Sequence, residues 1–210
     1  MKHTVIFDID GVIVDSEQLH FDVLKELAPE QTQGVVPEDL IGLSLEETLT
    51  QIGVPVEKRS ELTDSIVDVY KKSLAPEYLR PGSKALIEAL IAQQVPFGFV
   101  STAPRDICLA NIATLELDLD PILISGDDVE RTKPYPDPYL AMLERLGADG
   151  ETTIVIEDTD LGIKAATTAG IHNVFGWPHA LSGTESYELA TRVIKDLSEI
   201  PHFDALSIAA

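Results

Sequence analysis

Five short runs of apolar, largely β-branched residues recur along the chain and predict the strands of a buried sheet. The runs are continuously apolar rather than alternating, which is typical of strands covered on both faces. They are Thr4–Ile9, Val95–Val100, Ile122–Ser125, Thr153–Ile156 and Asn173–Phe175. Helical patterns lie between and after them, at Ser83–Gln94, Asp106–Leu115, Pro136–Leu146, Leu161–Ala169 and Ser186–Leu197. This alternation predicts an α/β fold built on a doubly wound parallel sheet.

One long segment, from about Asp15 to Arg80, breaks the alternation because it contains no convincing strand. Its periodic stretches are helical, at Glu17–Leu27, Leu45–Ile52 and Ser60–Leu74, with proline and glycine in the loops between them. The pattern predicts a helical cap domain of residues 15–80, inserted into a core domain of residues 1–14 and 81–210. The tail after Ile200 is expected to be a loosely attached end.

Charge and composition narrow the classes of partner. The chain of 210 residues carries a formal charge of −21 without a lysine or arginine cluster, so nucleic acids and anionic membranes are not expected as partners. An anionic small molecule would need a metal ion or a lysine in its pocket. Cys108, the single cysteine, excludes an internal disulfide and lies in an apolar stretch where burial is expected. With no leader pattern and no run of membrane-spanning length, a cytoplasmic protein is expected.

Two carboxylates follow the first predicted strand. Asp8 and Asp10 stand at i and i+2, at the carboxyl end where parallel α/β sheets place their ligands. Close carboxylates repel each other unless a positive charge lies beside them, and a hard cation such as Mg²⁺ would relieve this. Gly11 then supplies a turn, and Asp15-Ser16 is expected at the N-cap of the next helix. Taken alone, the pair has a less favoured alternative, in which it merely caps a turn.

Three further polar groups follow later strands. They are Ser101-Thr102 after the second, Lys133 after the third and Glu157-Asp158 after the fourth. Each has a simpler interpretation by itself, as a helix-capping serine, a solvated lysine or an acidic helix start. Four such groups after four successive strands would all meet at one edge of the sheet.

In this order the motifs resemble those of the haloacid-dehalogenase (HAD) superfamily, from residue 4 to about residue 177. The flanking sequences Lys133–Pro138 and Glu157–Ile163 are similar to those of β-phosphoglucomutases and related phosphatases. The resemblance implies a Rossmann-like core with a helical cap, and Mg²⁺ as cofactor. Asp10 favours phosphoryl chemistry, since the true dehalogenases of this superfamily lack the second aspartate.

The resemblance also implies roles for single residues. Asp8 would be the nucleophile that forms an aspartyl-phosphate, and Asp10 the general acid and base. Ser101 would bond a phosphoryl oxygen, and Lys133 would balance charge. Mg²⁺ would be held by Asp8, the carbonyl of Asp10, and Asp158, with Glu157 as a further ligand or a partner of the ligands. Asp160 is expected to be a helix N-cap.

The cap and the loop after Ser101 are expected to contact the substrate. The candidates are His20, Leu45, Thr102 and Arg105. His20 is spaced from Asp10 as in β-phosphoglucomutases, where a histidine helps orient the acid–base aspartate; a partly exposed histidine is the alternative. Leu45 stands in the segment Gly42–Glu47 where the mutase has an arginine for a distal phosphate, a clamp that leucine cannot replace.

These features lead to three hypotheses. The first is a phosphatase of small metabolites such as sugar phosphates, acting as a monomer or homodimer. The second is a phosphomutase of the β-phosphoglucomutase type. The third is a non-catalytic binding protein on the same fold, since a fold does not fix a function.

Overall fold

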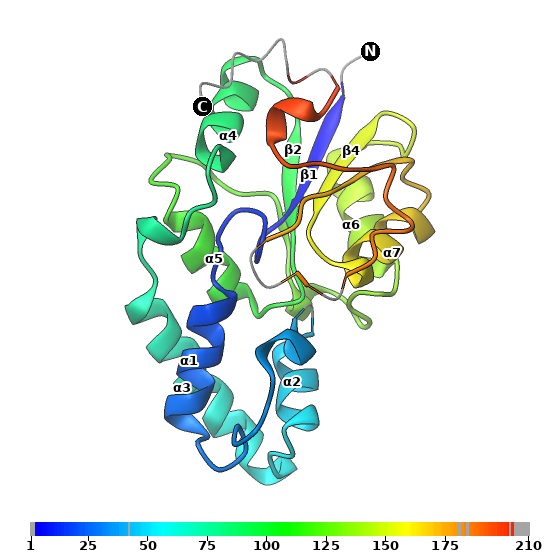
Figure 1. Cartoon of the computed structure of the whole chain (residues 1–210). Coiled ribbons are helices and arrows are strands. Elements are labelled where there is room, and N and C mark those ends of the chain that lie inside the picture. Colours follow the sequence, from blue (N-terminus) through cyan, green and yellow to red (C-terminus); the bar gives the residue numbers. More distant parts are fainter. Residues whose placement is uncertain (1–2, 42, 180–181, 184, 202, 204–210) are drawn as a thin grey trace.

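A parallel sheet of six strands runs through the centre of the molecule, in the order β3-β2-β1-β4-β5-β6 (Figure 1). The computed structural model describes residues 3–41, 43–179, 182–183, 185–201 and 203. The strands are β1 Thr4–Asp8, β2 Phe97–Val100, β3 Leu123–Ile124, β4 Thr153–Glu157, β5 Asn173–Gly176 and β6 Arg192–Val193. The predicted doubly wound parallel fold is confirmed.

The register of the sheet brings the ends of three strands to one level. Asp8, the last residue of β1, pairs with Val100 at the end of β2. On the other side of β1, Phe7 pairs with Ile156, one residue before the end of β4. The loops that leave β1, β2 and β4 therefore start next to one another.

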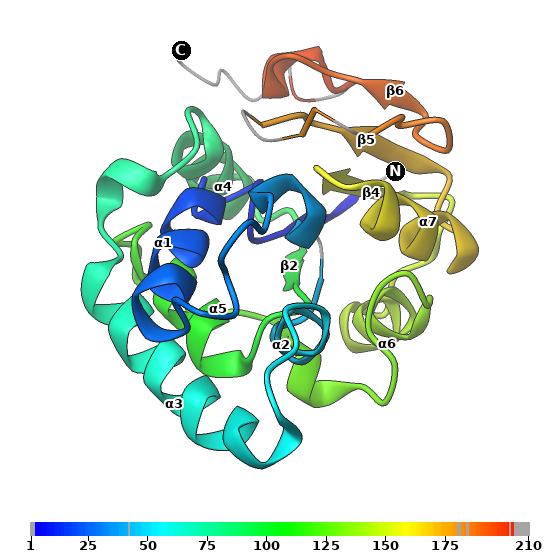
Figure 2. The same ribbon diagram turned by 60° about the horizontal axis from the view of Figure 1, so that its bottom comes forward.

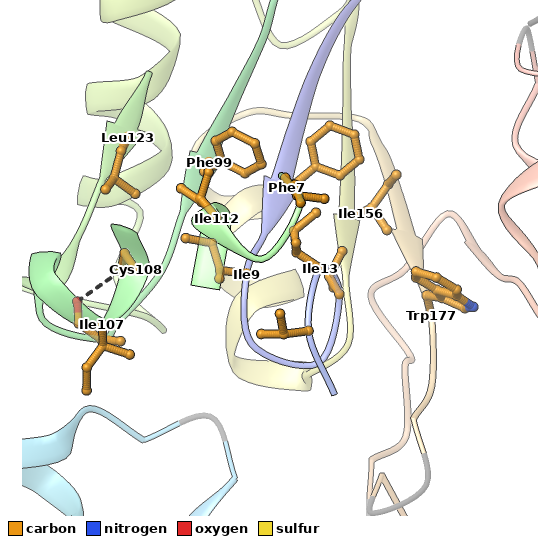
Figure 3. Packing of buried hydrophobic residues seen from close by; sticks show 14 of the residues in the cluster. Phe7, Ile9, Ile13, Phe99, Ile107, Cys108, Ile112, Leu123, Ile156 and Trp177 are labelled. Atoms are coloured by element: carbon orange, nitrogen blue, oxygen red, sulfur yellow. Dashed lines mark hydrogen bonds between the residues drawn. The ribbon is translucent and has the colours of Figure 1, made fainter. Parts of the chain in front are cut away.

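Both faces of the sheet are buried, as the continuously apolar strands predict. Along β1, Val5 and Phe7 contribute to one apolar cluster, whereas Ile6 contributes to the other. Figure 3 shows Phe7 and Phe99 together on neighbouring strands, with ring centroids 5.9 Å apart. Cys108 is fully buried in the same cluster, as expected, and its thiol lies 3.5 Å from the carbonyl oxygen of Ala103.

Helices cover the sheet on both sides. Figure 2 shows α4 and α5 on one side of the strands and α6 and α7 on the other. Their bounds are α4 Ser83–Ala92, α5 Arg105–Ala113, α6 Asp137–Leu146 and α7 Asp160–Thr168. The predicted helix end at Gly147 is confirmed, because this glycine caps α6 with a left-handed φ of 59°.

Three helices occupy the end of the molecule beyond the carboxyl end of β1 (Figure 1). They are α1 Glu17–Leu27, α2 Leu45–Gln51 and α3 Val56–Ser73. Helix α3 packs against α1 and against α5 of the sheet layer. Ser44 and Glu47 form a reciprocal capping box that starts α2. The chain enters this group of helices near Asp15 and leaves it near Tyr78. These two segments lie side by side, since the amide of Asp15 donates to the carbonyl of Tyr78 at 2.7 Å.

Two expectations about helices are wrong. The stretch Ser186–Leu197 is not a helix: it contains turns, the unpredicted edge strand β6, and the start of a short 3-10 turn at Leu197–Glu199. Asp160 is not the N-cap of α7, because Thr159 caps it and accepts from the amide of Gly162. Asp160 instead accepts hydrogen bonds from the amides of Ser186 and Tyr187, which holds this irregular stretch in place.

Gly42 and most of the predicted loose tail after Ile200 lie outside the described residues. No helix in the described part of the chain combines the length and apolar character that crossing a membrane requires.

Candidate active site

The four sequence motifs meet in one cavity at the carboxyl edge of the sheet. Asp8 ends β1, Ser101 follows β2, Lys133 lies in the loop between β3 and α6, and Asp158 follows β4. All four side chains line the same cavity and are nearly fully buried. The edge position expected from the strand order therefore corresponds to a real convergence of side chains.

Lys133 connects two of the acidic groups. Its ammonium group donates to a carboxylate oxygen of Asp8 and lies 2.6 Å from Oε1 of Glu157. Burial alone would lower the pKa of Lys133, but the carboxylates of Asp8 and Glu157 outweigh this effect and raise it. The lysine is therefore a permanent cation between two buried carboxylates.

The carboxylate of Glu157 is fixed by hydrogen bonds and by close packing. It accepts from the Tyr139 hydroxyl at 2.6 Å and from the amide of Asp158 at 3.2 Å. A Cβ on Gly162 would stand 1.9 Å from Oε1 of Glu157, so only glycine fits at this position in the first turn of α7. Glu157 is thus arranged to fix Lys133 in position.

Asp8, Glu157 and Asp158 form a buried acidic triad, each offering a carboxylate oxygen within 4.8 Å of the others. Burial raises the pKa of Asp8 and of Asp158, and the neighbouring carboxylates raise both further. No described residue forms a hydrogen bond of good geometry with either carboxylate oxygen of Asp158, and the nearest group is Nε2 of His179, 3.2 Å from Oδ2. An all-oxygen set with excess negative charge and unsatisfied acceptors fits a hard divalent cation.

Gly11 allows the loop after β1 to approach Asp158 closely. Its φ of +81° is left-handed, and a Cβ there would stand 2.0 Å from Oδ2 of Asp158. The predicted turn after Asp10 is confirmed by the amide of Gly11, which donates to the carbonyl of Val14.

The carboxylate of Asp10 is oriented by three neighbours. Its Oδ1 accepts from the hydroxyl of Ser16 and from the side-chain amide of Asn111, both at 2.9 Å. Its Oδ2 lies 3.3 Å from the hydroxyl of Ser101. Ser16 does precede α1 as its N-cap residue, but its hydroxyl bonds Asp10 instead of a helix amide.

The helical segment between Asp15 and Arg80 lines the cavity with side chains that are mainly apolar. They include Phe21, Leu24, Leu40, Leu43, Leu45 and Ile66. Of the expected substrate contacts, His20, Leu45 and Thr102 line the cavity. Between described side chains, no hydrogen bond joins His20 to Asp10; His20 stacks on Tyr70 instead, with centroids 4.2 Å apart.

Arg105 does not line the cavity, so the expected contact with substrate phosphate has no support from its position. Its guanidinium group forms two hydrogen bonds with the carboxylate of Asp128, at 2.8 and 2.7 Å. The partner lies in the turn after β3, so this pair ties the start of α5 to the neighbouring loop. An acidic partner 23 residues away gives no local signal in the sequence.

Several residues near the site escape sequence reasoning. Glu17 lines the cavity, where burial and then the charge of Asp10 raise its pKa, and its position directly after Asp15-Ser16 could have indicated this. His179 Nε2 lies 3.2 Å from Oδ2 of Asp158. Asn111 reaches Asp10 from α5, and a polar residue on the buried side of an apolar helix is a usable signal.

Comparison with known proteins agrees with this geometry. Residues 5–175 match the family of haloacid dehalogenase-like hydrolases, and the chain belongs to that family. The expected enzyme class, a HAD-type phosphoric monoester hydrolase, is confirmed by this match together with relatives named as phosphatases.

A phosphorylated carbohydrates phosphatase from Thermotoga maritima is 31% identical over 187 residues, which cover 85% of this chain and 86% of that protein. A hydrolase from Pseudomonas syringae superposes with a TM-score of 0.79 at 25% identity, over 99% of this chain and 100% of the other. A β-phosphoglucomutase from Clostridium difficile, at 20% identity, shares the fold with a TM-score of 0.80 over 98% of this chain and 96% of its own.

Proposed function

We propose that this protein is a Mg²⁺-dependent phosphatase of small phosphorylated metabolites that works through an aspartyl-phosphate on Asp8. The observation that carries the proposal is the contact of Lys133 with Asp8 in a cavity that Asp10, Ser101 and Asp158 also line. The ammonium group of Lys133 lowers the pKa of Asp8 against the larger effect of burial; it thereby favours the ionised, nucleophilic form, and it attracts the phosphoryl group.

Each side chain has a distinct task in the proposed reaction. Asp8 attacks phosphorus in line while Asp10 protonates the leaving oxygen; Asp10 then takes a proton from the water that hydrolyses the aspartyl-phosphate. Ser101 and Lys133 orient the phosphoryl oxygens. Asp8, Asp158 and the backbone carbonyl of Asp10 would hold Mg²⁺, which supplies positive charge against the developing negative charge.

The charges in the cavity favour hydrolysis over phosphomutase chemistry. Among the described residues that line it, Lys133 is the one lysine or arginine, and Asp8 and Glu157 already engage it. Leu45 lines the cap side, where a second phosphate would need a cation. A bisphosphate intermediate therefore has no evident partner for its distal group.

The nature of the Thermotoga relative and the composition of the lining favour a phosphorylated carbohydrate as substrate. His20, Thr48 and Thr102 line the cavity and can bond neutral hydroxyl groups. We also propose that residues 15–80 form the substrate-covering cap and that residues 1–14 and 81–210 form the core. The adjacent crossings support this division: Val14 bridges Leu79, and the Arg80 amide donates to the Ile13 carbonyl.

A panel of phosphate monoesters, assayed for phosphate release with and without Mg²⁺, tests the proposal. We expect turnover that requires Mg²⁺ and falls by about a thousandfold or more in Asp8→Asn, because the nucleophile is lost. Asp118→Asn is the matched control, since Asp118 is exposed and remote from the cavity lining. Turnover that survives Asp8→Asn would contradict the mechanism, and tight binding of esters without turnover would support a binding protein instead.

A further inference from the structure

A buried chain of hydrogen bonds runs from the cap to Asp10. The hydroxyl of Tyr70, on α3, donates to Oδ1 of Asn111, on α5, at 2.7 Å. The side-chain amide of Asn111 then donates to Oδ1 of Asp10 at 2.9 Å. Tyr70 and Asn111 are both fully buried, with 0% of their surface exposed, so water does not compete for these bonds.

We propose that Tyr70 and Asn111 are positioning residues that direct the catalytic proton of Asp10 to its Oδ2. The inference rests on the proposed role of Asp10 as general acid and base. Neither residue belongs to the sequence motifs of the site, and neither lines the cavity. They would act on the reaction through Asp10 alone.

The chemistry of the groups fixes the direction of every bond in this chain. An ionised carboxylate only accepts hydrogen bonds, so Asn111 must present its NH₂ group to Asp10. Its carbonyl oxygen then faces Tyr70, whose hydroxyl has to donate. Burial raises the pKa of Tyr70, so this hydroxyl keeps its proton. The amide of Asn111 therefore has one orientation.

Two donors at one oxygen decide where a proton on Asp10 can be placed. Oδ1 receives the amide of Asn111 and also the hydroxyl of Ser16, each at 2.9 Å. A proton on Oδ1 would have to face these donors, so it is placed on Oδ2 instead. Oδ2 accepts one longer bond, of 3.3 Å, from the hydroxyl of Ser101, which lines the cavity together with Asp8. Unlike the amide of Asn111, this hydroxyl can rotate and accept instead when Oδ2 carries the proton.

This placement suits both half-reactions. As the bond between phosphorus and the leaving oxygen breaks, the proton moves from Oδ2 of Asp10 to that oxygen. Asp10 is then a carboxylate whose Oδ2, held only by the longer bond from Ser101, accepts a proton from the attacking water. Asn111 and Tyr70 exchange no proton themselves: Asn111 keeps Oδ1 of Asp10 occupied throughout, and Tyr70 holds the amide of Asn111 in place.

These hydrogen bonds also make the orientation of Asp10 depend on the position of the cap. Tyr70 stands on α3, and His20, which lines the cavity from α1, stacks on its ring at 4.2 Å and 14°. A shift of the cap helices away from α5 would break the bond between Tyr70 and Asn111. Asp10 is therefore best oriented when the cap lies in the position described here.

The test compares two phosphate esters that differ in their need for an acid. An alkyl phosphate leaves as an alkoxide that must be protonated, whereas p-nitrophenyl phosphate leaves as a stable anion. The quantity measured is kcat/KM, because it reports the steps up to release of the alcohol or phenol and excludes later hydrolysis of the aspartyl-phosphate. We expect Asn111→Leu to lower kcat/KM for the alkyl ester about tenfold, a part of the usual effect of a general acid, and for the aryl ester less than about threefold.

Tyr70→Phe removes only the hydroxyl and keeps the ring that stacks on His20. It should produce a smaller loss of the same selective kind. Because Tyr70 acts through Asn111, Tyr70→Phe should cause no additional loss once Asn111 is leucine. The double variant also guards against misfolding, since replacing both buried partners with apolar groups leaves no unsatisfied polar atom.

Lys71→Met is the matched control for a looser contact between cap and core. Lys71 pairs with Asp106 at 3.2 Å between the same two helices, α3 and α5, without touching Asp10. It should leave the ratio of the two kcat/KM values unchanged. Equal losses on both esters, no loss, or a selective loss in Lys71→Met would each overturn the positioning role.

Failure of this inference is distinguishable from failure of the proposed function. If the wild type hydrolyses the esters and Asp8→Asn does not, while the Asn111 and Tyr70 variants keep the wild-type ratio, only the positioning role is wrong. If the wild type hydrolyses no ester, the proposed function is wrong.

Discussion

The two ends of the cavity differ in almost every physical respect. At the core end, the ionisable side chains of Asp8, Lys133 and Asp158 are buried, and they lie at strand ends or in the loop that follows β3. At the cap end, the lining is mainly apolar and comes from helices and the loops between them. If the proposed function holds, the core end stabilises the charge that develops in the reaction, and the cap end selects the leaving group by shape and apolar contact.

The ends also differ in how they are attached. The core end is built on a sheet whose strands pair on both sides of β1. The cap end is attached to the core by two adjacent chain segments, near Asp15 and Tyr78, and by the contact between α3 and α5. Changes at the core end should therefore affect metal binding and stability, whereas changes at the cap end should affect substrate preference.

The largest effect should follow from Asp158→Asn, which removes a ligand at the core end. We expect the Mg²⁺ concentration for half-maximal phosphate release to rise about a hundredfold or more. Changing a residue that only hydrogen-bonds a metal ligand typically weakens metal binding by about 10- to 100-fold, and losing the ligand itself should cost at least as much. Because Mg²⁺ binds only the folded protein, it should also raise the wild-type Tm. That rise should be absent in the variant.

The same substitution should raise Tm when Mg²⁺ is absent. Burial raises the pKa of Asp158, and the neighbouring carboxylate of Glu157 raises it further, so the charged form is unfavourable in the folded protein without a cation. Asparagine keeps the shape and removes the charge. Asp118→Asn should change neither the Mg²⁺ dependence of phosphate release nor Tm. If Asp158→Asn still gains stability from Mg²⁺, Asp158 is excluded as a ligand.

The next effect concerns Glu157, the partner that holds Lys133. Glu157→Gln leaves the ammonium group with one carboxylate in a fully buried site, and removing one partner of a buried ion pair costs about 3 kcal/mol in the free energy of unfolding. Tyr139→Phe removes only the 2.6 Å hydrogen bond to Glu157 and should cost about 1 kcal/mol. Urea unfolding measures both, and equal values for the two variants would refute the importance of the ion pair.

The sequence predicts the core end far better than the cap end, for a physical reason. Asp8, Ser101 and Asp158 lie at the end of a strand or directly after it, and parallel strands bring their carboxyl ends to the same edge. Knowing the strands is then enough to bring these three together, whereas Lys133 lies further along the loop after β3 and is placed by its motif. The helices α1 and α6 were predicted within one residue, because their apolar periodicity and end residues agree.

What the sequence did not predict depends on contacts between distant segments. The stretch Ser186–Leu197 has helical composition, but bonds to Asp160 and pairing of β6 with β5 outweigh that local preference. The pairing of Arg105 with Asp128 and the chain from Tyr70 to Asp10 likewise join separate elements. Such contacts follow from packing of helices on the sheet, which periodicity does not encode.

The smallest effect should come from the cap end. There Leu45→Arg tests whether the cavity favours monophosphates because no cation lies on the cap side to bind a second phosphate. Leu45 lines the cavity in the first turn of α2, so an arginine there could bond a distal phosphate. One charge-assisted bond contributes about 1.5 kcal/mol, so KM for a sugar bisphosphate should fall about tenfold relative to the matching monophosphate. Leu45→Met keeps the volume and charge and should leave the ratio of the two KM values unchanged. If Leu45→Arg instead impairs both substrates equally, Leu45 lies outside the region that reads the leaving group, and the proposed division between the two ends of the cavity does not extend to α2.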